Sequence, residues 1–261
     1  MQTRHYGSSG PVVILIHGGP GASGYMAPVA RELADSFQVM EPLQRVSGDE
    51  PLTVTRHIAD LHELIESNCE DTRPTLVGHS WGAMLALGYA AAHPGRVASI
   101  VLVGCGTFDA ATREQLKIAR DERTDDSLRQ RLARLRKEIP DPDRRLEAMG
   151  NLTLSLYSYD LITTHLEVEV YDSRAHRESW EDMVRLQDNG MYPAALSAID
   201  VPVLMLHGTV DPHPGRMIRA SLEEYLPQIE YREWDRCGHY PWLEKAVRDE
   251  FFAALREWLT R

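Results

Sequence analysis

Hydrophobic and polar positions follow two alternating patterns along most of the chain. Short continuous runs of aliphatic residues are typical of strands that a parallel sheet buries on both faces. Such runs, some of them shorter or more mixed, occupy 12–16, 37–40, 74–77, 98–103, 201–206 and 229–234. Between them apolar residues recur three or four positions apart, which predicts helices over 25–36, 53–69, 83–92, 215–226 and 244–259. Strands that alternate with helices predict an α/β fold with a mostly parallel, doubly wound sheet.

Two segments fall outside this alternation. Residues 1–10 are polar, and Gly7-Ser8-Ser9-Gly10 predicts a turn or a frayed lead-in. From about 107 to 195 charges are dense, no strand-like run occurs, and the apolar residues have helical spacing. Basic residues are interleaved there with acidic ones, as on a solvated helix face. We therefore expect a helical cap at 107–195, inserted between the two parts of an α/β core at 1–106 and 196–261.

Composition narrows the choice of partners and compartment. A net charge of −11 argues against nucleic acid and anionic membrane surfaces as partners. No apolar run approaches the length of a membrane span, and residues 1–6 contain no signal-peptide core. The three cysteines are odd in number and widely spaced, which is typical of reduced thiols. We expect a cytoplasmic protein without a membrane or nucleic-acid partner.

The sequence Gly78-His79-Ser80-Trp81-Gly82 lies between a strand-like run and an Ala/Leu-rich helical run. In that setting Gly-x-Ser-x-Gly predicts a nucleophile elbow, a tight strand-to-helix turn that exposes the serine hydroxyl. Glycines suit the positions where strand and helix approach each other most closely. The elbow identifies Ser80 as the candidate nucleophile.

A second glycine-rich segment, 17–23, follows the first buried strand. It lacks the Lys-Ser/Thr ending of a P-loop and the glycine spacing of a dinucleotide fingerprint. We interpret it as half of an oxyanion hole, a backbone N–H donor that pairs with the N–H after the nucleophile.

A serine nucleophile needs a base, and the base needs an acid that fixes its tautomer. Asp211 and His239 each stand in a loop just past a strand, at the carboxyl edge of the sheet where the elbow also lies. The order Ser80, Asp211, His239 is the order used by folds with such an elbow. His213 is an alternative base and Asp109 an alternative acid. These groups complete an acyl-transfer site without a metal or an organic cofactor.

The whole chain resembles an α/β-hydrolase with a helical cap. Its segments His17-Gly18-Gly19-Pro20-Gly21 and Gly78-His79-Ser80-Trp81-Gly82 are similar to motifs of the proline iminopeptidase family. The resemblance implies that Gly19 and Trp81 supply the oxyanion N–H groups, and that Ser80, Asp211 and His239 form the triad. Gln44-Arg45 resembles the Asp-Gln-Arg-Gly segment of that family, but Leu43 and Val46 replace its Asp and Gly.

These features predict a serine hydrolase of a small-molecule or short-peptide amide or ester, with an aminopeptidase preferred. A small-molecule carboxylesterase, or a non-catalytic ligand-binding protein on the same fold, remains the alternative. An aminopeptidase needs a carboxylate near Ser80 to hold the substrate's ammonium group. Besides Gly18 and Trp180 as substrate contacts, the candidate carboxylates are Glu167, Glu169, Asp172, Glu178, Glu181 and Asp182. Alternatively, all six lie on solvated faces.

Overall fold

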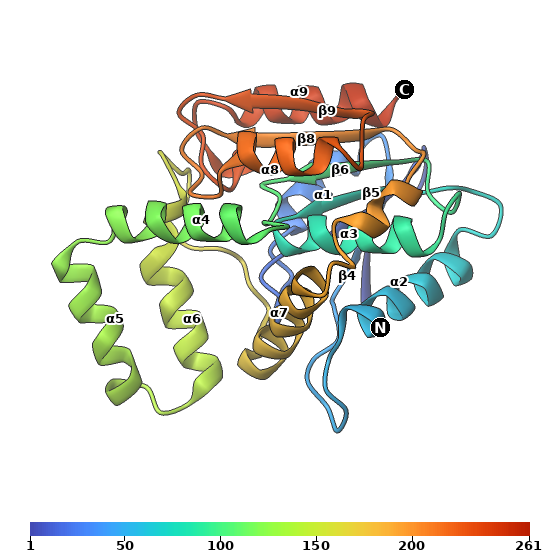
Figure 1. The fold of residues 1–261 in the computed structure, drawn as a ribbon. Coiled ribbons are helices and arrows are strands. Elements are labelled where there is room, and N and C mark those ends of the chain that lie inside the picture. The colour runs from blue at the N-terminus through green and yellow to red at the C-terminus, as the bar shows by residue number, and fades with distance from the viewer.

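The computed structural model describes residues 1–261 and contains a central seven-stranded sheet (Figure 1). The strands follow the order β1-β4-β2-β5-β6-β8-β9, and all neighbours are parallel except β1 and β4. Their bounds are β1 Thr3–Tyr6, β2 Val12–Ile16, β4 Gln38–Pro42, β5 Thr75–His79, β6 Ser99–Val103, β8 Val203–Gly208 and β9 Ile229–Trp234. The predicted α/β fold with a mostly parallel sheet is confirmed.

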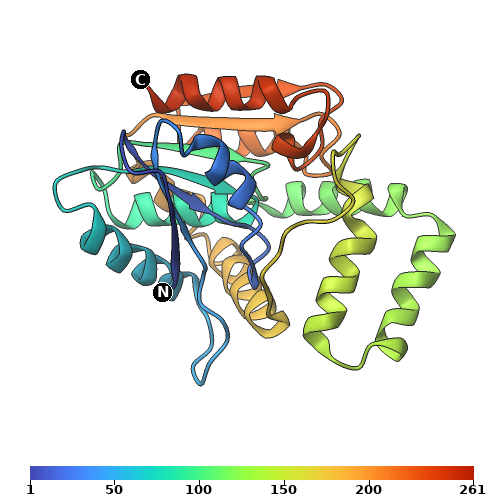
Figure 2. The ribbon, with the colours of Figure 1, turned by 180° about the vertical axis from the view of Figure 1, so that it is seen from behind.

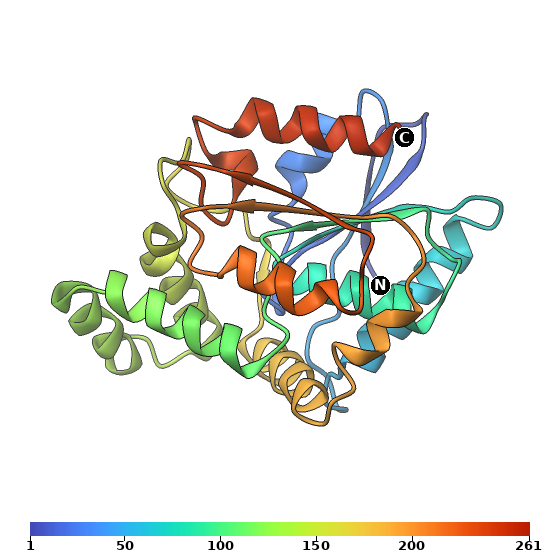
Figure 3. The same ribbon diagram turned by 45° about the horizontal axis from the view of Figure 1, so that its top comes forward.

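Helices cover both faces of this sheet, because alternate residues of each buried strand point to opposite sides. Val13 and Leu15 of β2 pack with helices α1 (Ala27–Leu33) and α9 (Arg248–Leu259). Ile14 and Ile16 pack on the other side with α2 (Val54–Asn68), α3 (Trp81–Ala92) and α8 (Gly215–Glu223). Figure 3 shows α9 on one side of the sheet and α8 and α3 on the other. The two apolar layers therefore fix the strand ends that carry the candidate site.

Residues 3–6 form β1, a strand that the hydrophobic pattern did not predict, and residues 7–10 connect it to β2 without helix or strand structure. Strand β1 pairs antiparallel with β4 at the edge of the sheet, for example Thr3 with Pro42. An edge strand is held by the backbone hydrogen bonds of one neighbour and is only partly covered, so a polar sequence suits it. The hydrophobic pattern gives no signal for such a strand.

The segment between β6 and β8 is largely helical, as expected. It contains α4 (Ala110–Arg123), α5 (Asp126–Glu138), α6 (Pro142–Thr153), the 3₁₀ turn η1 (Leu154–Tyr157), α7 (Ser173–Asp188) and a second 3₁₀ turn, η2 (Ala194–Ala198). Helices α4 to α6 project beyond the carboxyl ends of the strands (Figures 1 and 2). Helix α7 instead packs on the core through Met183 and Leu186. None of the helices has the length and apolar character that crossing a bilayer requires.

The expectation that this segment holds no strand is wrong at one place. Residues Val170–Tyr171 form β7, which pairs antiparallel with β3 (Ala22–Ser23) just after the glycine-rich segment. Two residues of backbone pairing leave no periodicity that a sequence pattern could reveal. This short ladder ties the inserted segment to the loop that carries Gly19.

Candidate active site

Ser80 occupies the turn between β5 and α3 with φ 56° and ψ −120°. A residue with a side chain rarely adopts this conformation, so the surrounding packing must enforce it. A Cβ atom at Gly78 would lie 2.4 Å from the carbonyl oxygen of Gly82, and one at Gly82 would lie 2.2 Å from that of Ile16. Both glycines of the motif are therefore required by the close approach of strand and helix. The turn presents Ser80 to a cavity at the carboxyl edge of the sheet.

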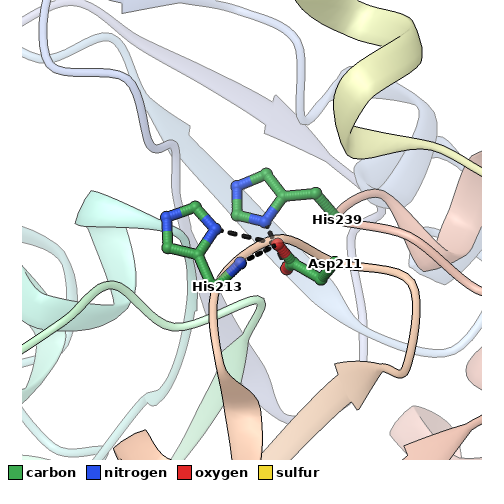
Figure 4. Close-up of side chains that lie close together, drawn as sticks. All are labelled: Asp211, His213 and His239. Carbon is green, nitrogen blue, oxygen red and sulfur yellow. Dashed lines mark hydrogen bonds and ion pairs between the residues drawn. The ribbon is translucent and has the colours of Figure 1, made fainter. Parts of the chain in front are cut away.

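Asp211 and His239 meet at the same edge, in the loops that follow β8 and β9. Nδ1 of His239 lies 2.6 Å from Oδ2 of Asp211, and the two residues are 3% and 6% exposed (Figure 4). An ionised carboxylate can only accept, so Nδ1 carries the proton and Nε2 keeps its lone pair. The backbone N–H of His239 donates to the carbonyl of Tyr157 at 2.7 Å, which holds the loop in place. The structure thus gives His239 the tautomer that a general base needs.

Burial and charge act in opposite directions on this pair. Burial opposes ionisation of Asp211, but the neighbouring imidazoles of His239, His213 and His207 outweigh it and hold its pKa well below the usual range. Burial also lowers the pKa of His239, and the Asp211 carboxylate offsets only part of that effect. The imidazole of His239 is therefore neutral at neutral pH, as a base must be.

His213 contacts the other oxygen of the same carboxylate. Both its ring Nδ1, at 2.8 Å, and its backbone N–H, at 2.9 Å, donate to Oδ1 of Asp211. Its ring stacks on His239 with centroids 4.6 Å apart and planes 14° apart. The three side chains have the residue types of a metal site, but their contacts of 2.6 and 2.8 Å are hydrogen bonds between donors and an acceptor. The Asp-x-His spacing was the sequence signal for this contact.

Asp109, the alternative acid, has a different role. Its side chain accepts from the N–H of Thr112 at 2.7 Å and caps the first turn of α4. The structure therefore pairs His239 with Asp211 and leaves Asp109 at a helix end.

The glycine-rich segment reaches Ser80 through its backbone. A Cβ atom at Gly18 would lie 2.6 Å from Cβ of Ser80, so only glycine fits there. The N–H of Gly18 donates to the hydroxyl of Tyr25 at 2.6 Å, and Gly18 is buried and does not line the cavity. The structure therefore places Gly18, an expected substrate contact, behind the cavity wall with its N–H donor occupied by Tyr25. Gly19, with φ 48°, does line the cavity, as do Ser80 and Trp81.

Tyr25 and His79 extend the hydrogen bond of Gly18 to the loop that carries His239. Nε2 of His79 donates to the carbonyl of His239 at 2.9 Å, which leaves Nδ1 as an acceptor for the hydroxyl of Tyr25 at 2.7 Å. A buried chain of three hydrogen bonds thus joins Gly18, Tyr25, His79 and His239. No sequence pattern predicts this chain of hydrogen bonds, because its members come from segments that lie far apart in the sequence.

The cavity above Ser80 has a volume of about 340 Å³ and is lined mainly by apolar and aromatic side chains. Trp180, an expected contact, is among them, together with Tyr157, Tyr240 and several leucines. No aspartate or glutamate lines it, and the one permanently charged lining side chain is Arg120, whose guanidinium lies 6.0 Å from the centre of the Tyr157 ring. The cavity wall is therefore apolar to weakly cationic.

Glu167 and Glu169, the expected carboxylate contacts, are both exposed and lie outside the cavity lining. Glu167 pairs with Arg31 at 3.1 Å, and Glu169 pairs with Arg4. The remaining acids of this region also lie outside the lining. Asp172 caps α7, and Glu178 and Asp182 accept from the backbone N–H groups of Leu52 and Val54 at 2.9 and 2.8 Å.

Gln44 and Arg45 form hydrogen bonds and an ion pair behind the glycine-rich segment. The backbone N–H of Gln44 donates to Nε2 of His17, and its side chain donates to the His17 carbonyl at 2.7 Å. Arg45 forms a bidentate pair with Asp60, with both contacts at 2.7 Å. The two Gln44 contacts hold His17, the residue that begins the glycine-rich segment.

Comparison with known proteins agrees with this architecture. The model of the alpha/beta hydrolase family matches residues 13–255. The chain belongs to the alpha/beta hydrolase family. A proline iminopeptidase of Lactobacillus helveticus is 27% identical over 277 residues, covering 97% of this chain and 90% of that protein. A 2-hydroxy-6-oxononadienedioate/2-hydroxy-6-oxononatrienedioate hydrolase of Paraburkholderia phymatum is 27% identical over 265 residues, covering 94% and 87%.

Solved structures of this family have the same fold. A thermophilic esterase from Thermogutta terrifontis superposes with a TM-score of 0.65 at 21% sequence identity, covering 99% of this chain and 92% of that one. The family and the fold identify the protein as a hydrolase of the α/β fold.

Proposed function

We propose that this α/β hydrolase is a serine hydrolase that cleaves small esters through an acyl-enzyme. Ser80 attacks the ester carbonyl carbon while Nε2 of His239 takes the hydroxyl proton, and Asp211 holds the imidazole and stabilises its charge. The protonated His239 then donates to the leaving alcohol as the C–O bond breaks. The strained turn at Ser80 and the Asp211–His239 contact at 2.6 Å support these roles.

The oxyanion that forms during each step needs donors fixed in advance. We assign the N–H groups of Gly19 and Trp81 to this role. Trp81 is the first residue of α3, and the first N–H groups of a helix have no partner within it. Gly19 lines the same cavity from the opposite loop.

The observation that carries the choice of substrate is the absence of carboxylates from the cavity wall. A protonated amine brought into an apolar cavity without a counter-charge loses several kcal/mol of hydration. The wall offers no aspartate or glutamate, and its permanent charge, on Arg120, has the wrong sign for an ammonium group. Neutral esters avoid this cost, and Arg120 can offset it for esters that bear a carboxylate. A cavity of about 340 Å³ suits small acyl groups.

A proline iminopeptidase activity is the second candidate. It is favoured by the relative of that name, which aligns over 97% of this chain, and by the two glycine motifs. It would require the ammonium group to be held by hydroxyl or carbonyl oxygens, or by a carboxylate that moves in from outside the lining.

A substrate panel separates these activities. We expect turnover of p-nitrophenyl acetate and butyrate, and no cleavage of prolyl naphthylamide beyond that of its N-acetylated form. Ser80→Ala serves as the blank for contaminating hydrolases. Cleavage of prolyl naphthylamide with its acetylated form ignored would establish the aminopeptidase instead. If wild type and Ser80→Ala show the same rates on every compound, the chain is a non-catalytic binding protein.

A further inference from the structure

His213 has one ring nitrogen whose role is not explained by the triad. Its Nδ1 and backbone N–H both donate to Asp211, and the residue lines the cavity that Ser80 and His239 also line. The residue is only 9% exposed. A buried imidazole with one nitrogen turned to a reaction cavity is placed to bind a reactant.

The tautomer of His213 follows from the same argument as for His239. Oδ1 of Asp211 can only accept, so the proton of a neutral His213 is on Nδ1 and Nε2 is an acceptor. The two rings are nearly parallel, and in Figure 4 their Nε2 atoms point the same way, away from Asp211. One carboxylate thus orients two imidazoles so that two lone pairs face the cavity side by side.

The two rings lie close enough together for both to contact one small reactant. Their centroids are 4.6 Å apart. A water molecule has two hydrogens and can donate one to each of two acceptors. A leaving alcohol has one hydroxyl hydrogen and cannot use both acceptors.

We propose that Nε2 of His213 binds and orients the water that hydrolyses the acyl-enzyme, a step that rests on the proposed serine-hydrolase mechanism. The water donates one hydrogen to His239 and the other to His213. Its oxygen attacks the acyl carbon as His239 takes the first proton. The tetrahedral adduct then breaks its bond to Oγ of Ser80, and His239 returns that proton to Oγ. The second hydrogen leaves with the carboxylic acid product.

The test measures formation and decay of the acyl-enzyme separately, with p-nitrophenyl acetate. His213→Asn keeps an N–H donor near the position of Nδ1, and therefore the contact with Asp211, but has no acceptor at the position of Nε2. We expect the burst of p-nitrophenol from this variant to stay within about threefold of wild type. Decay of the acetyl-enzyme, followed by intact mass, should slow about tenfold or more. This effect is smaller than the loss of a general acid or base, because His239 still takes the proton. Hydroxylamine, a stronger nucleophile that needs less activation, should restore the decay.

His213→Phe provides the second variant if His213→Asn does not fold. It keeps the stacked ring but removes both nitrogens, so both steps should slow, with decay slowed more than formation. Equal slowing of the two steps in either variant would mean that His213 only holds Asp211 and would overturn the proposal, as would an unchanged decay. A wild-type enzyme that never forms an acetyl-enzyme would overturn the proposed function itself, a result distinct from these.

Discussion

The Asp211 carboxylate accepts the Nδ1 proton of His239 at 2.6 Å, and both side chains are almost completely buried. In Asp211→Asn the amide can donate to Nδ1, which would move the imidazole proton to Nε2 and remove the base. We expect kcat to fall roughly 10⁴-fold, as when the acid of a serine triad is replaced in this way. Steady-state kinetics with p-nitrophenyl butyrate measure the loss.

Asp109→Ala is the matched control for that substitution. It removes the cap of α4 and should lower the free energy of unfolding by about 1 kcal/mol, with kcat close to that of wild type. A large loss of kcat in Asp109→Ala, together with a mild effect of Asp211→Asn, would move the acid to Asp109.

The pH profile follows from the lowered pKa of His239. Burial shifts this pKa below the ordinary value of about 6.5, and only the neutral imidazole accepts a proton from Ser80. The value of kcat/KM should therefore be constant at neutral pH and fall only as the pH drops through that lowered pKa. A profile of kcat/KM from acid to neutral pH checks this. An acid limb centred above pH 6.5 would be inconsistent with a desolvated base.

The absence of a side chain at Gly104 leaves room for the imidazole of His239. A Cβ atom there would lie 2.8 Å from Nδ1 of His239, and the residue has φ 53°. Gly104→Ala should displace the imidazole and lower kcat by about 10²-fold, the cost of misplacing a catalytic group by roughly 1 Å.

Gly95→Ala gives the control for backbone strain alone. Gly95 has φ 76°, and a Cβ atom there would meet nothing within 4 Å. Its substitution should cost about 1 kcal/mol of stability and leave kcat unchanged. If both variants lose activity in proportion to their loss of stability, the contact with His239 is not the cause.

Tyr25 joins the glycine-rich segment to the base loop. Tyr25→Phe removes the acceptor of the Gly18 N–H and the donor to His79, which leaves two buried groups unsatisfied. We expect a loss of roughly 1–3 kcal/mol in the free energy of unfolding. We also expect kcat to decrease more than KM changes, because the segment carries an oxyanion donor.

Tyr171→Phe is the comparison, since Tyr171 also lines the cavity and its hydroxyl makes no hydrogen bond in the structure. Chemical denaturation and steady-state kinetics on both variants measure the effects. Equal results for the two would contradict a linking role for Tyr25.

The features that sequence patterns predicted are those encoded locally. The buried strands carry continuous aliphatic runs, and the elbow at Ser80 needs its two glycines for steric reasons visible in a five-residue motif. Asp211 and His239 could be paired because parallel strands end at one edge.

Contacts made between distant segments could not be predicted in this way. Strands β1 and β7 are held by backbone pairing that no side-chain pattern encodes. The acids Glu167 and Glu169 have suitable chemistry for an ammonium ion, but their arginine partners are more than a hundred residues away in the chain. Only their positions in space reveal that they lie outside the cavity.

The measurement that tests the central claim most directly is covalent labelling of Ser80 by a fluorophosphonate. Wild type should be labelled at Ser80, and Ser80→Ala should remain unlabelled and lose roughly 10⁴-fold or more in kcat, with an unchanged thermal unfolding curve. Labelling of Ser80→Ala to the same extent as wild type, or retention of its esterase activity, would contradict the assignment of Ser80 as the nucleophile.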